Sequence, residues 1–529
     1  MTGARSVVTD RTPGRLAVGA RCLGGVLVGL ALGLAFPPYG LWWLAVPTVA
    51  ALTLLVVGLG LRAAALVGLL AGVATFAVQL RWMLVIGPDA WSLVTLLEAA
   101  FLAAVTAGTT LVRRLRGWPV WAACLWVSSE LARSYVPFGG FPWGRLAFAQ
   151  SDAPFRSYAA VGGMPLVSFA VALSGTLLAA GVLAARSADR RRAGAVAVAA
   201  ALAVPLAALA VPLATDGSTV TAAVVQGNVP RTGLDAFGQR AAVLDNHVTA
   251  TEQLATDIAA GRRPQPQLVV WPENSTDIDP YADASVAAQI QGAVDAVKAP
   301  TLVGAVVTNP ADPATVLNLG IVWAPTGSPG GGGPGDTYAK RHPVPFGEYV
   351  PFRSVLTRFI TRLDRIPRDF APGPRPGLLQ LGPVRIGDVI CFEVAYDPLV
   401  QDVAAGDPGL LVVQTNNSTY GRTGQPDQQL AMSRLRAIET GRTVLVAATS
   451  GLSAVVAPDG HLVAASHEFE RWVYDGPVTV RTGTTLATRL GPWPGLALGT
   501  LGVCAAVLAS VRRRRERSPS ADARRTEPT

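Results

Sequence analysis

Long apolar runs dominate the first 213 residues and recur once near the C-terminus. A run of about 20 apolar residues is long enough to cross the hydrocarbon core of a bilayer as a helix. Residues 214–487 contain no run of this kind. The pattern therefore predicts a helical membrane domain over 16–213 and a final transmembrane helix within 488–511. The eight predicted spans lie near 16–36, 41–61, 63–86, 91–112, 118–136, 161–185, 193–213 and 490–511.

The loops between these spans differ in charge. Arginines gather at 62, at 113–116 and at 186–192, in alternate loops, and at 512–515 on the same side by parity. Loops rich in arginine remain in the cytoplasm. The rule predicts a cytoplasmic N-terminal segment (1–15), a cytoplasmic, disordered basic tail (512–529) and an extracytoplasmic domain over 214–487. Two acids, Glu98 and Glu130, fall inside spans, and we interpret them as groups that face polar helix interfaces.

The segment 214–487 has another pattern. Short β-rich runs alternate with helical patterns, and several of the runs are apolar throughout. This arrangement is typical of a layered α/β domain whose strands are buried on both faces. The glycine-rich stretch 328–335 lacks the GK[ST] ending of a phosphate loop, so we expect a flexible insertion there. The strands are expected at 219–229, 268–273, 301–307, 317–323, 384–393, 410–417 and 443–451, and the helices around 236–260, 284–298 and 424–441.

Composition agrees with a membrane protein and excludes other classes. Half of the residues are apolar and 15% are charged, against about a quarter charged in soluble domains. The net charge of +9 comes from arginines at the ends of apolar runs, which argues against a nucleic-acid partner. Three of the four cysteines lie in apolar runs, and no CxxC pair or histidine cluster occurs. The sequence therefore indicates no metal site and no disulfide framework.

Three polar residues follow buried strands in the α/β segment: Glu273, Lys340 and Cys391. A free thiol has a pKa of about 8.5 and needs a base before it becomes a good nucleophile at neutral pH. A carboxylate can take its proton, and an ammonium can stabilise the oxyanion that forms when the sulfur attacks a carbonyl carbon. The chain has only two lysines, Lys298 and Lys340. A lysine in this segment suggests that a compact point charge is required there.

Several motifs strengthen this hypothesis. WPE (271–273), YAK with PFGEYVPF (338–352) and ICFE (390–393) resemble the Glu-Lys-Cys signatures of the nitrilase superfamily. Together with the membrane spans, they resemble the apolipoprotein N-acyltransferases. The resemblance continues through QGN (226–228), GFPWGRLAFAQ (140–150) and QLAMSRLRAIETGR (429–442). It implies a polytopic membrane domain joined to an αββα sandwich.

The resemblance also implies roles for single residues. Cys391 matches the nucleophile, Glu273 the general base and Lys340 the catalytic lysine. The implied supporting residues are Glu348, which orients the lysine, a further site glutamate Glu393, the pocket residue Asn318, and the backbone N–H of Phe392 as a second oxyanion donor. The apolar loops 138–143 and 344–352 are predicted to guide acyl chains, with Trp143, Phe346 and Tyr349 as candidate substrate-binding residues.

The implied reaction is a ping-pong transfer in a bacterial cytoplasmic membrane, without metal or organic cofactor. A phospholipid donates an acyl chain to Cys391, and a diacylated apolipoprotein accepts it on its N-terminal amine. A polyprenol-phosphate mannose synthase, linked to some relatives, would be a separate chain. Two alternatives stay open: a membrane-anchored nitrilase-type amidase or hydrolase with the same three residues, and a polytopic transporter or scaffold whose external domain only binds.

Overall fold

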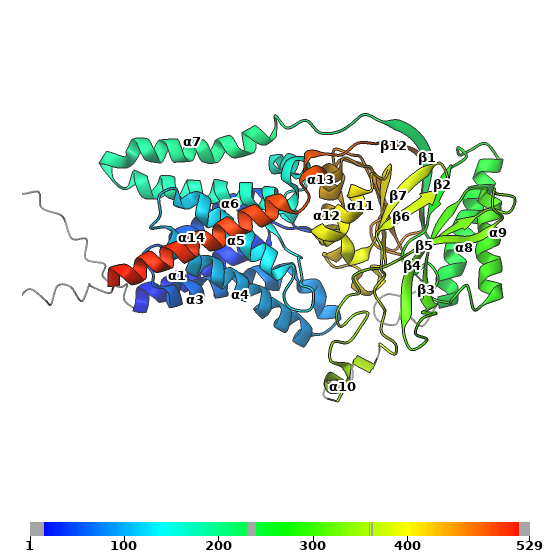
Figure 1. The fold of residues 1–529 in the computed structure, drawn as a ribbon, viewed down its shortest axis with the longest axis horizontal. Helices are drawn as coiled ribbons and strands as arrows, with labels where there is room; N and C mark the ends of the chain where they lie inside the picture. The colour runs from blue at the N-terminus through cyan, green and yellow to red at the C-terminus, as the bar shows by residue number, and fades with distance from the viewer. Residues whose placement is uncertain (1–14, 230–239, 359, 361–362, 365, 518–529) are drawn as a thin grey trace, which may run out of the picture.

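The computed structural model describes residues 15–229, 240–358, 360, 363–364 and 366–517. It contains a helical body and a β-rich body side by side along the long axis of the molecule (Figure 1). A helix lies at each of the eight predicted spans. These helices are α1 (Arg15–Gly33), α2 (Ala45–Leu55), α3 (Leu61–Gln79), α4 (Pro88–Val112), α5 (Trp118–Arg133), α6 (Ala159–Ala185), α7 (Arg191–Ala208) and α14 (Trp493–Arg517).

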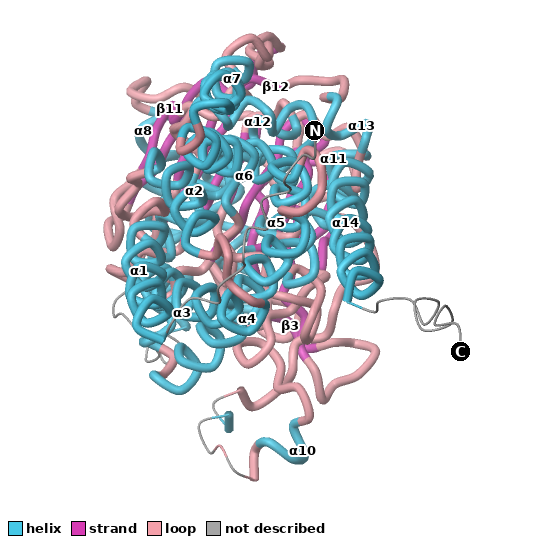
Figure 2. Tube along the Cα trace, turned by 90° about the vertical axis from the view of Figure 1, so that its left-hand side faces the viewer, coloured by secondary structure: helices cyan, strands magenta, loops and turns pink. Residues whose placement is uncertain are grey.

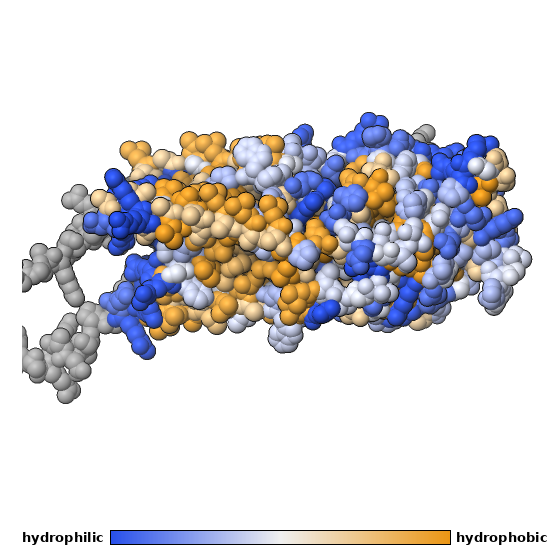
Figure 3. Space-filling view, turned by 90° about the horizontal axis from the view of Figure 1, so that it is seen from above, coloured by the Kyte–Doolittle hydropathy of each residue, from blue (hydrophilic) through white to orange (hydrophobic). Residues whose placement is uncertain are grey.

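Six of the eight helices are long and apolar enough to cross a membrane: α1, α3, α4, α6, α7 and α14. The other two are shorter than the predicted spans, since α2 has 11 residues and α5 has 16. At 1.5 Å per residue, α5 extends about 24 Å, less than the ~30 Å of a hydrocarbon core. In Figure 3 an apolar surface covers the helical body, and hydrophilic residues gather at its far end and over the β-rich body.

The C-terminal tail differs from the sequence prediction. We expected disorder from residue 512, but α14 continues to Arg517. Arginine is a good helix former, so the basic run extends the apolar helix instead of ending it. The predicted segment 1–15, apart from its last residue, and residues 518–529 lie outside the described part of the chain.

The β-rich body contains two six-stranded sheets with the same plan. The first has the order β12-β1-β2-β3-β4-β5 and the second β11-β10-β9-β8-β7-β6. In each sheet three parallel strands, β1–β3 or β7–β9, have antiparallel neighbours. The bounds are β1 (Ser218–Gln226), β2 (Leu268–Val270), β3 (Thr301–Thr308), β4 (Val316–Ala324), β5 (Gly333–Ala339), β6 (Gly377–Leu381), β7 (Val384–Ile390), β8 (Leu410–Thr415), β9 (Val444–Ala448), β10 (Ala454–Val456), β11 (Leu462–Ala465) and β12 (Trp472–Val480).

Helices cover the outer faces of the two sheets. On the first sheet, α8 (Arg240–Ala259) and α9 (Ala284–Val297) pack over an apolar core that includes Trp271. On the second, α11 (Asp397–Ala405) and α12 (Gln425–Thr440) contact β7 and β9. The body is therefore an αββα sandwich, as predicted. Short helices α10 (Arg353–Leu356) and α13 (Leu486–Leu490) complete it, and α10 projects away from the sandwich (Figure 2).

The glycine-rich stretch 328–335 is not wholly a flexible insertion. Its last residues begin the edge strand β5, because Gly333 and Pro334 pair with Ala324 and Trp323 of β4. The helix α11 and the strands β6, β10, β11 and β12 were not predicted. The strands β6, β10 and β11 have five residues or fewer, and α11 is a helix of nine residues. The strand β12 is longer, but Asp475, Gly476 and Pro477 interrupt its apolar pattern. These elements lie at the edges of the sheets or beside them.

One glutamine joins the helical body to the sandwich. Gln428, buried on α12, accepts hydrogen bonds from the indole N–H groups of Trp82 (3.2 Å) and Trp143 (2.6 Å). Its amide nitrogen donates to the carbonyls of Pro37 and Gln79, each at 2.9 Å. A single side chain thus satisfies polar groups from three separate segments of the helical body.

A buried ionic group reinforces this contact, and we name it the joint cluster: Arg145, Asp397, Arg436 and Glu439. Asp397 contacts Arg145 at 2.6 Å and Arg436 at 2.8 Å, and Arg436 also contacts Glu439 at 2.5 Å. Arg436 donates in addition to the carbonyls of Val394 (2.8 Å) and Ala395 (3.1 Å). The cluster therefore connects the loop after α5 to the segment that follows Cys391.

Candidate active site

The three predicted catalytic residues lie where strands end. Glu273 follows β2, Lys340 follows β5 and Cys391 follows β7. The carboxyl ends of parallel strands are the edge at which layered α/β domains expose functional side chains. Because one sheet supplies Glu273 and Lys340 and the other supplies Cys391, the site forms between the two sheets.

Cys391 occupies a sharp turn between β7 and the 3-10 helix of residues Cys391–Ala395. Its φ of +58° lies in the left-handed region, which is unusual for a residue with a side chain. The turn is held by Glu393, whose carboxylate accepts the backbone N–H of Ile390 at 2.7 Å. The thiol is 5% exposed. A strained turn of this kind fixes the direction of a nucleophile's side chain.

Lys340 lies between two carboxylates, and we name Glu273, Lys340 and Glu348 the catalytic cluster. The Lys340 ammonium is 3.1 Å from Glu273 and 2.8 Å from Glu348. Asn318 donates from its amide to both acids, at 2.7 Å to Glu273 and 3.2 Å to Glu348. The other oxygen of Glu273 accepts the backbone N–H of Asn416 at 2.8 Å. The carboxylate of Glu273 is therefore fixed on both oxygens.

Glu348 comes from the tight turn of the PFGE motif. Its second carboxylate oxygen accepts the backbone N–H of Val344 at 2.8 Å, so the side chain closes its own turn while it contacts Lys340. The arrangement agrees with the orienting role that the resemblance implies for this residue.

Glu393 supports the site in a different manner. It accepts the hydroxyl of Tyr338 (2.8 Å) and the backbone N–H groups of Arg341 (2.7 Å) and His342 (3.1 Å). These partners flank Lys340 in the chain. Glu393 thus ties the lysine segment to the turn of the nucleophile. Burial raises the pKa of Glu393, although the N–H donors and Lys340 act in the opposite direction.

The electrostatics favour a neutral thiol beside a charged lysine. Burial, aided by the charge of Glu273, raises the pKa of Cys391 to about 12, while Lys340 and a hydrogen bond from Thr415 lower it. Burial also opposes a charge on Lys340, but Glu273 and Glu348 outweigh this effect and raise its pKa well above the ordinary value. A nucleophilic role for this sulfur, as predicted from the sequence, would therefore need a base to take its proton. Glu273, whose charge acts on the pKa of this thiol, is the predicted base.

The predicted substrate-binding residues occupy different places. Trp143 is 1% exposed and packs on Phe392, with ring centroids 4.7 Å apart, so it lies in the interface of the two bodies. Phe346 is 39% exposed and makes an edge contact with Phe138 of the helical body. Tyr349 is half-buried in the same turn as Phe346. Of the three side chains, that of Phe346 is the one that is exposed at the surface.

Sequence reasoning missed two neighbours of the site, Thr415 and Asn416. The hydroxyl of Thr415 is 3.4 Å from the sulfur of Cys391, and the N–H of Asn416 contacts Glu273. Thr415 and Asn416 lie at the end of an apolar strand, and this position, which led to the prediction of Glu273, could also have indicated them. In the described part of the chain no group of histidine, cysteine and acidic residues could hold a metal ion.

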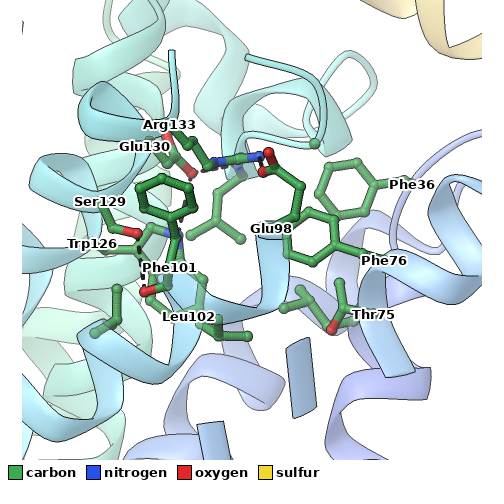
Figure 4. Close-up of a pocket in the computed structure, with 14 residues that line it drawn as sticks. Phe36, Thr75, Phe76, Glu98, Phe101, Leu102, Trp126, Ser129, Glu130 and Arg133 are labelled. Carbon is green, nitrogen blue, oxygen red and sulfur yellow. Dashed lines mark hydrogen bonds and ion pairs between the residues drawn. The ribbon is translucent and has the colours of Figure 1, made fainter. Parts of the chain in front are cut away.

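A small hollow lies within the helical body (Figure 4). It has a volume of about 30 Å³ and is lined mainly by apolar side chains, with Glu98, Glu130 and Arg133 among them. Arg133 donates to Glu98 at 2.7 Å and to the carbonyl of Trp143 at 2.5 Å. Glu130 accepts the N–H of Leu146 at 2.7 Å. Both acids thus face polar partners between helices.

Comparisons with known proteins cover both bodies. Residues 28–177 match the family described as "Apolipoprotein N-acyltransferase N-terminal domain", and residues 221–484 match "Carbon-nitrogen hydrolase". The apolipoprotein N-acyltransferase of Mycolicibacterium smegmatis is 40% identical over 91% of this chain and 84% of its own length. That of Azotobacter vinelandii is 32% identical over 95% of this chain and 98% of its own. A solved amidase from Nesterenkonia sp. AN1, with acetamide bound covalently at its active-site cysteine, is 18% identical, with a TM-score of 0.36 over 51% of this chain and 93% of its own.

Proposed function

Because the chain belongs to the apolipoprotein N-acyltransferases, we propose that it transfers a fatty acyl chain from a phospholipid to a lipoprotein through a thioester on Cys391. The observation that carries the proposal is the catalytic cluster. Its fixed carboxylate and its ammonium both act electrostatically on the buried thiol of Cys391, whose pKa burial raises to about 12. A second feature fits lipid substrates: the site adjoins an apolar helical body through Phe392 and Trp143.

In the first half-reaction the sulfur of Cys391 attacks the ester carbonyl of the phospholipid, and Glu273 takes the thiol proton. The oxyanion is stabilised by the Lys340 ammonium and the backbone N–H of Phe392. When the intermediate collapses, the C–O bond breaks and Glu273 returns the proton to the leaving alkoxide. The products are a lysophospholipid and an acyl-enzyme thioester.

In the second half-reaction the neutral α-amine of an S-diacylglyceryl cysteine attacks the thioester. Glu273 takes a proton from this nitrogen, the C–S bond breaks, and the thiolate recovers a proton from Glu273. The thioester retains the activation of the original ester, so the cycle needs no cofactor. The product is an N-acylated lipoprotein and the free enzyme.

We also propose an orientation with the sandwich outside the cytoplasm. Arginines at 113, 114, 116, 186, 190–192 and 512–515 lie at ends of helices α4, α6, α7 and α14 that point away from the sandwich (Figures 1 and 3). The positive-inside rule assigns that end to the cytoplasm. An impermeant maleimide applied to whole cells should label Ala260→Cys on the sandwich and leave Arg116→Cys unlabelled; the reverse pattern would contradict the orientation.

The test of the reaction is mass spectrometry of protein incubated with phospholipid carrying a labelled acyl chain. We expect a hydroxylamine-labile acyl group on the peptide that contains Cys391, and its transfer to a diacylated peptide. Cys391→Ala should abolish the label, whereas Cys504→Ala, at an exposed cysteine on α14, should keep it. Release of free fatty acid without transfer would support a hydrolase instead, and a label that survives in Cys391→Ala would overturn the mechanism.

A further inference from the structure

Thr415 is the last residue of β8, and its hydroxyl lies between the nucleophile and a buried amide. The Oγ1 atom is 3.4 Å from the sulfur of Cys391 and 3.1 Å from Oε1 of Gln429 on α12. The side chain is 1% exposed. Because Thr415 is buried away from solvent, its hydroxyl hydrogen points to one of two acceptors, the sulfur of Cys391 or Oε1 of Gln429.

The acceptor on Gln429 already has donors. Its Oε1 accepts from the amide of Asn417 at 2.8 Å and from the amide of Gln425 at 3.2 Å. A carbonyl oxygen has two lone pairs, and these two amides fill them. Thr415 is therefore a third donor to that oxygen. Its hydrogen can turn to the sulfur of Cys391, and Oε1 of Gln429 still keeps its two amide donors.

The sulfur, in contrast, has one hydrogen-bond partner in the described part of the chain, and that partner is Thr415. The position of Thr415 is also well fixed. Its carbonyl accepts the backbone N–H of Thr449, and the next residue, Asn416, donates its N–H to Glu273 at 2.8 Å. Two consecutive residues therefore contact the nucleophile and the base.

We propose that Thr415 is a further catalytic residue, whose hydroxyl donates a hydrogen bond to the Cys391 sulfur whenever that sulfur carries negative charge. The inference rests on the proposed role of Cys391 as nucleophile. Negative charge develops on the sulfur twice, when it gives its proton to Glu273 during the attack and when it leaves in the second half-reaction. In the acyl-enzyme the sulfur is neutral, and the hydroxyl turns back to Gln429. No proton is transferred to or from Thr415.

The test measures the reactivity of the thiol and not acyl transfer. Wild type, Thr415→Val and Thr415→Ser are treated with iodoacetamide at pH 8, and alkylation of the Cys391 peptide is followed by mass spectrometry. Loss of a hydrogen bond to a charged acceptor should lower the thiolate fraction about tenfold. Because a more basic thiolate is the better nucleophile, the alkylation rate should fall by roughly three- to tenfold. The Thr415→Ser variant, which keeps the hydroxyl, should stay within about twofold of wild type.

The control is Thr440→Val, which removes another buried hydroxyl from the sandwich. Thr440 donates to the carbonyl of Arg436 and makes no contact with the sulfur. Cys391 in the Thr440→Val variant should be alkylated at the wild-type rate. The melting temperature of each variant checks folding, and Thr415→Ala replaces the valine variant should that variant not fold. Alkylation of the hydroxyl-free variant at the wild-type rate, or of Thr415→Ser as slowly as Thr415→Val, would overturn the proposal.

The same samples separate this inference from the proposed function. If wild-type protein alkylated at Cys391 still transfers acyl chains, the role of Cys391 fails whatever the rates are. If alkylation abolishes transfer but Thr415 has no effect on the rate, the function stands and the role of Thr415 is wrong.

Discussion

The catalytic cluster and the joint cluster are both buried groups of acids and cations, but they use different cations. The joint cluster contains two arginines, and Arg436 spreads its donors over two carbonyls and two carboxylates. The catalytic cluster contains one lysine, whose single nitrogen contacts two carboxylates. Guanidinium groups suit several fixed partners, whereas an ammonium is a compact charge with rotatable donors. The difference fits a structural role for the joint cluster and the proposed catalytic role of the other.

The largest loss of stability is expected for Arg436→Met, which tests the structural role of the joint cluster. The substitution leaves Glu439 and two carbonyls without their cation inside the protein, and it leaves Asp397 with Arg145 alone. Removal of one partner from a buried ion pair typically costs about 3–5 kcal/mol. We expect a loss of this size in the free energy of unfolding, measured by denaturation in detergent. The same change at Arg262, whose pair with Asp257 is 59% exposed on the arginine side, should cost no more than about 1 kcal/mol. Equal losses would mean that the joint cluster is not structural.

The second test exchanges the cation in the catalytic cluster. Lys340→Arg keeps the charge but replaces a point donor by a planar fork in a space shaped for one nitrogen. Misplacement of an oxyanion donor typically raises the barrier by about 2.7–4 kcal/mol, so thioester formation should fall by roughly 10²–10³-fold. Lys298→Arg changes the chain's other lysine, which is exposed at the end of α9, and serves as the control. Full activity in Lys340→Arg would refute the distinction between the two cations.

A third test concerns Gln428, which joins the helical body to the sandwich through uncharged hydrogen bonds. Gln428→Leu leaves two indole N–H groups and two carbonyls without partners. A buried unsatisfied polar group costs about 1–3 kcal/mol, and relaxation of the tryptophans should keep the total in that range. The midpoint of thermal unfolding reports the loss, with Gln253→Leu on the exposed face of α8 as control. A variant as stable as the control would show that Gln428 does not stabilise the contact between the two bodies.

The last test, whose effect per pH unit is the smallest, concerns Asp388 between the sheets, whose carboxylate oxygens have no hydrogen-bond partner among the described residues. Burial raises its pKa well above the ordinary value, with Glu393 and Glu273 adding to the shift. As the pH rises above about 3.9, the unfolded chain releases this proton and the folded chain keeps it. Stability then falls by up to about 1.4 kcal/mol per pH unit until the folded carboxyl ionises. Asp388→Asn does not titrate, so its advantage over wild type should increase from pH 4 to pH 6. A constant difference would contradict the assignment of a neutral acid.

Much of this arrangement could be predicted from the sequence. The helical body, the sandwich and the positions of Glu273, Lys340 and Cys391 follow from hydrophobic runs and from residues at strand ends. The partners of Glu393 could not be predicted, because a carboxylate that binds backbone N–H groups leaves no mark on the residues that supply them. The contacts of Gln428 could not be predicted for the same reason. Its partners are up to 391 positions away in the chain, and its neighbours on α12 are also polar. Thr415 was visible as a strand-end residue, but its contact with sulfur depends on how the second sheet packs.

The pairing of Glu98 with Arg133 has a consequence for the synthesis of the protein. The two residues lie on α4 and α5, 35 positions apart. If α4 entered the bilayer before α5 was synthesised, its carboxyl would face lipid without the guanidinium of Arg133. A charged residue at the centre of a lone helix opposes insertion, so α4 and α5 are expected to enter the bilayer as a hairpin and not one after the other.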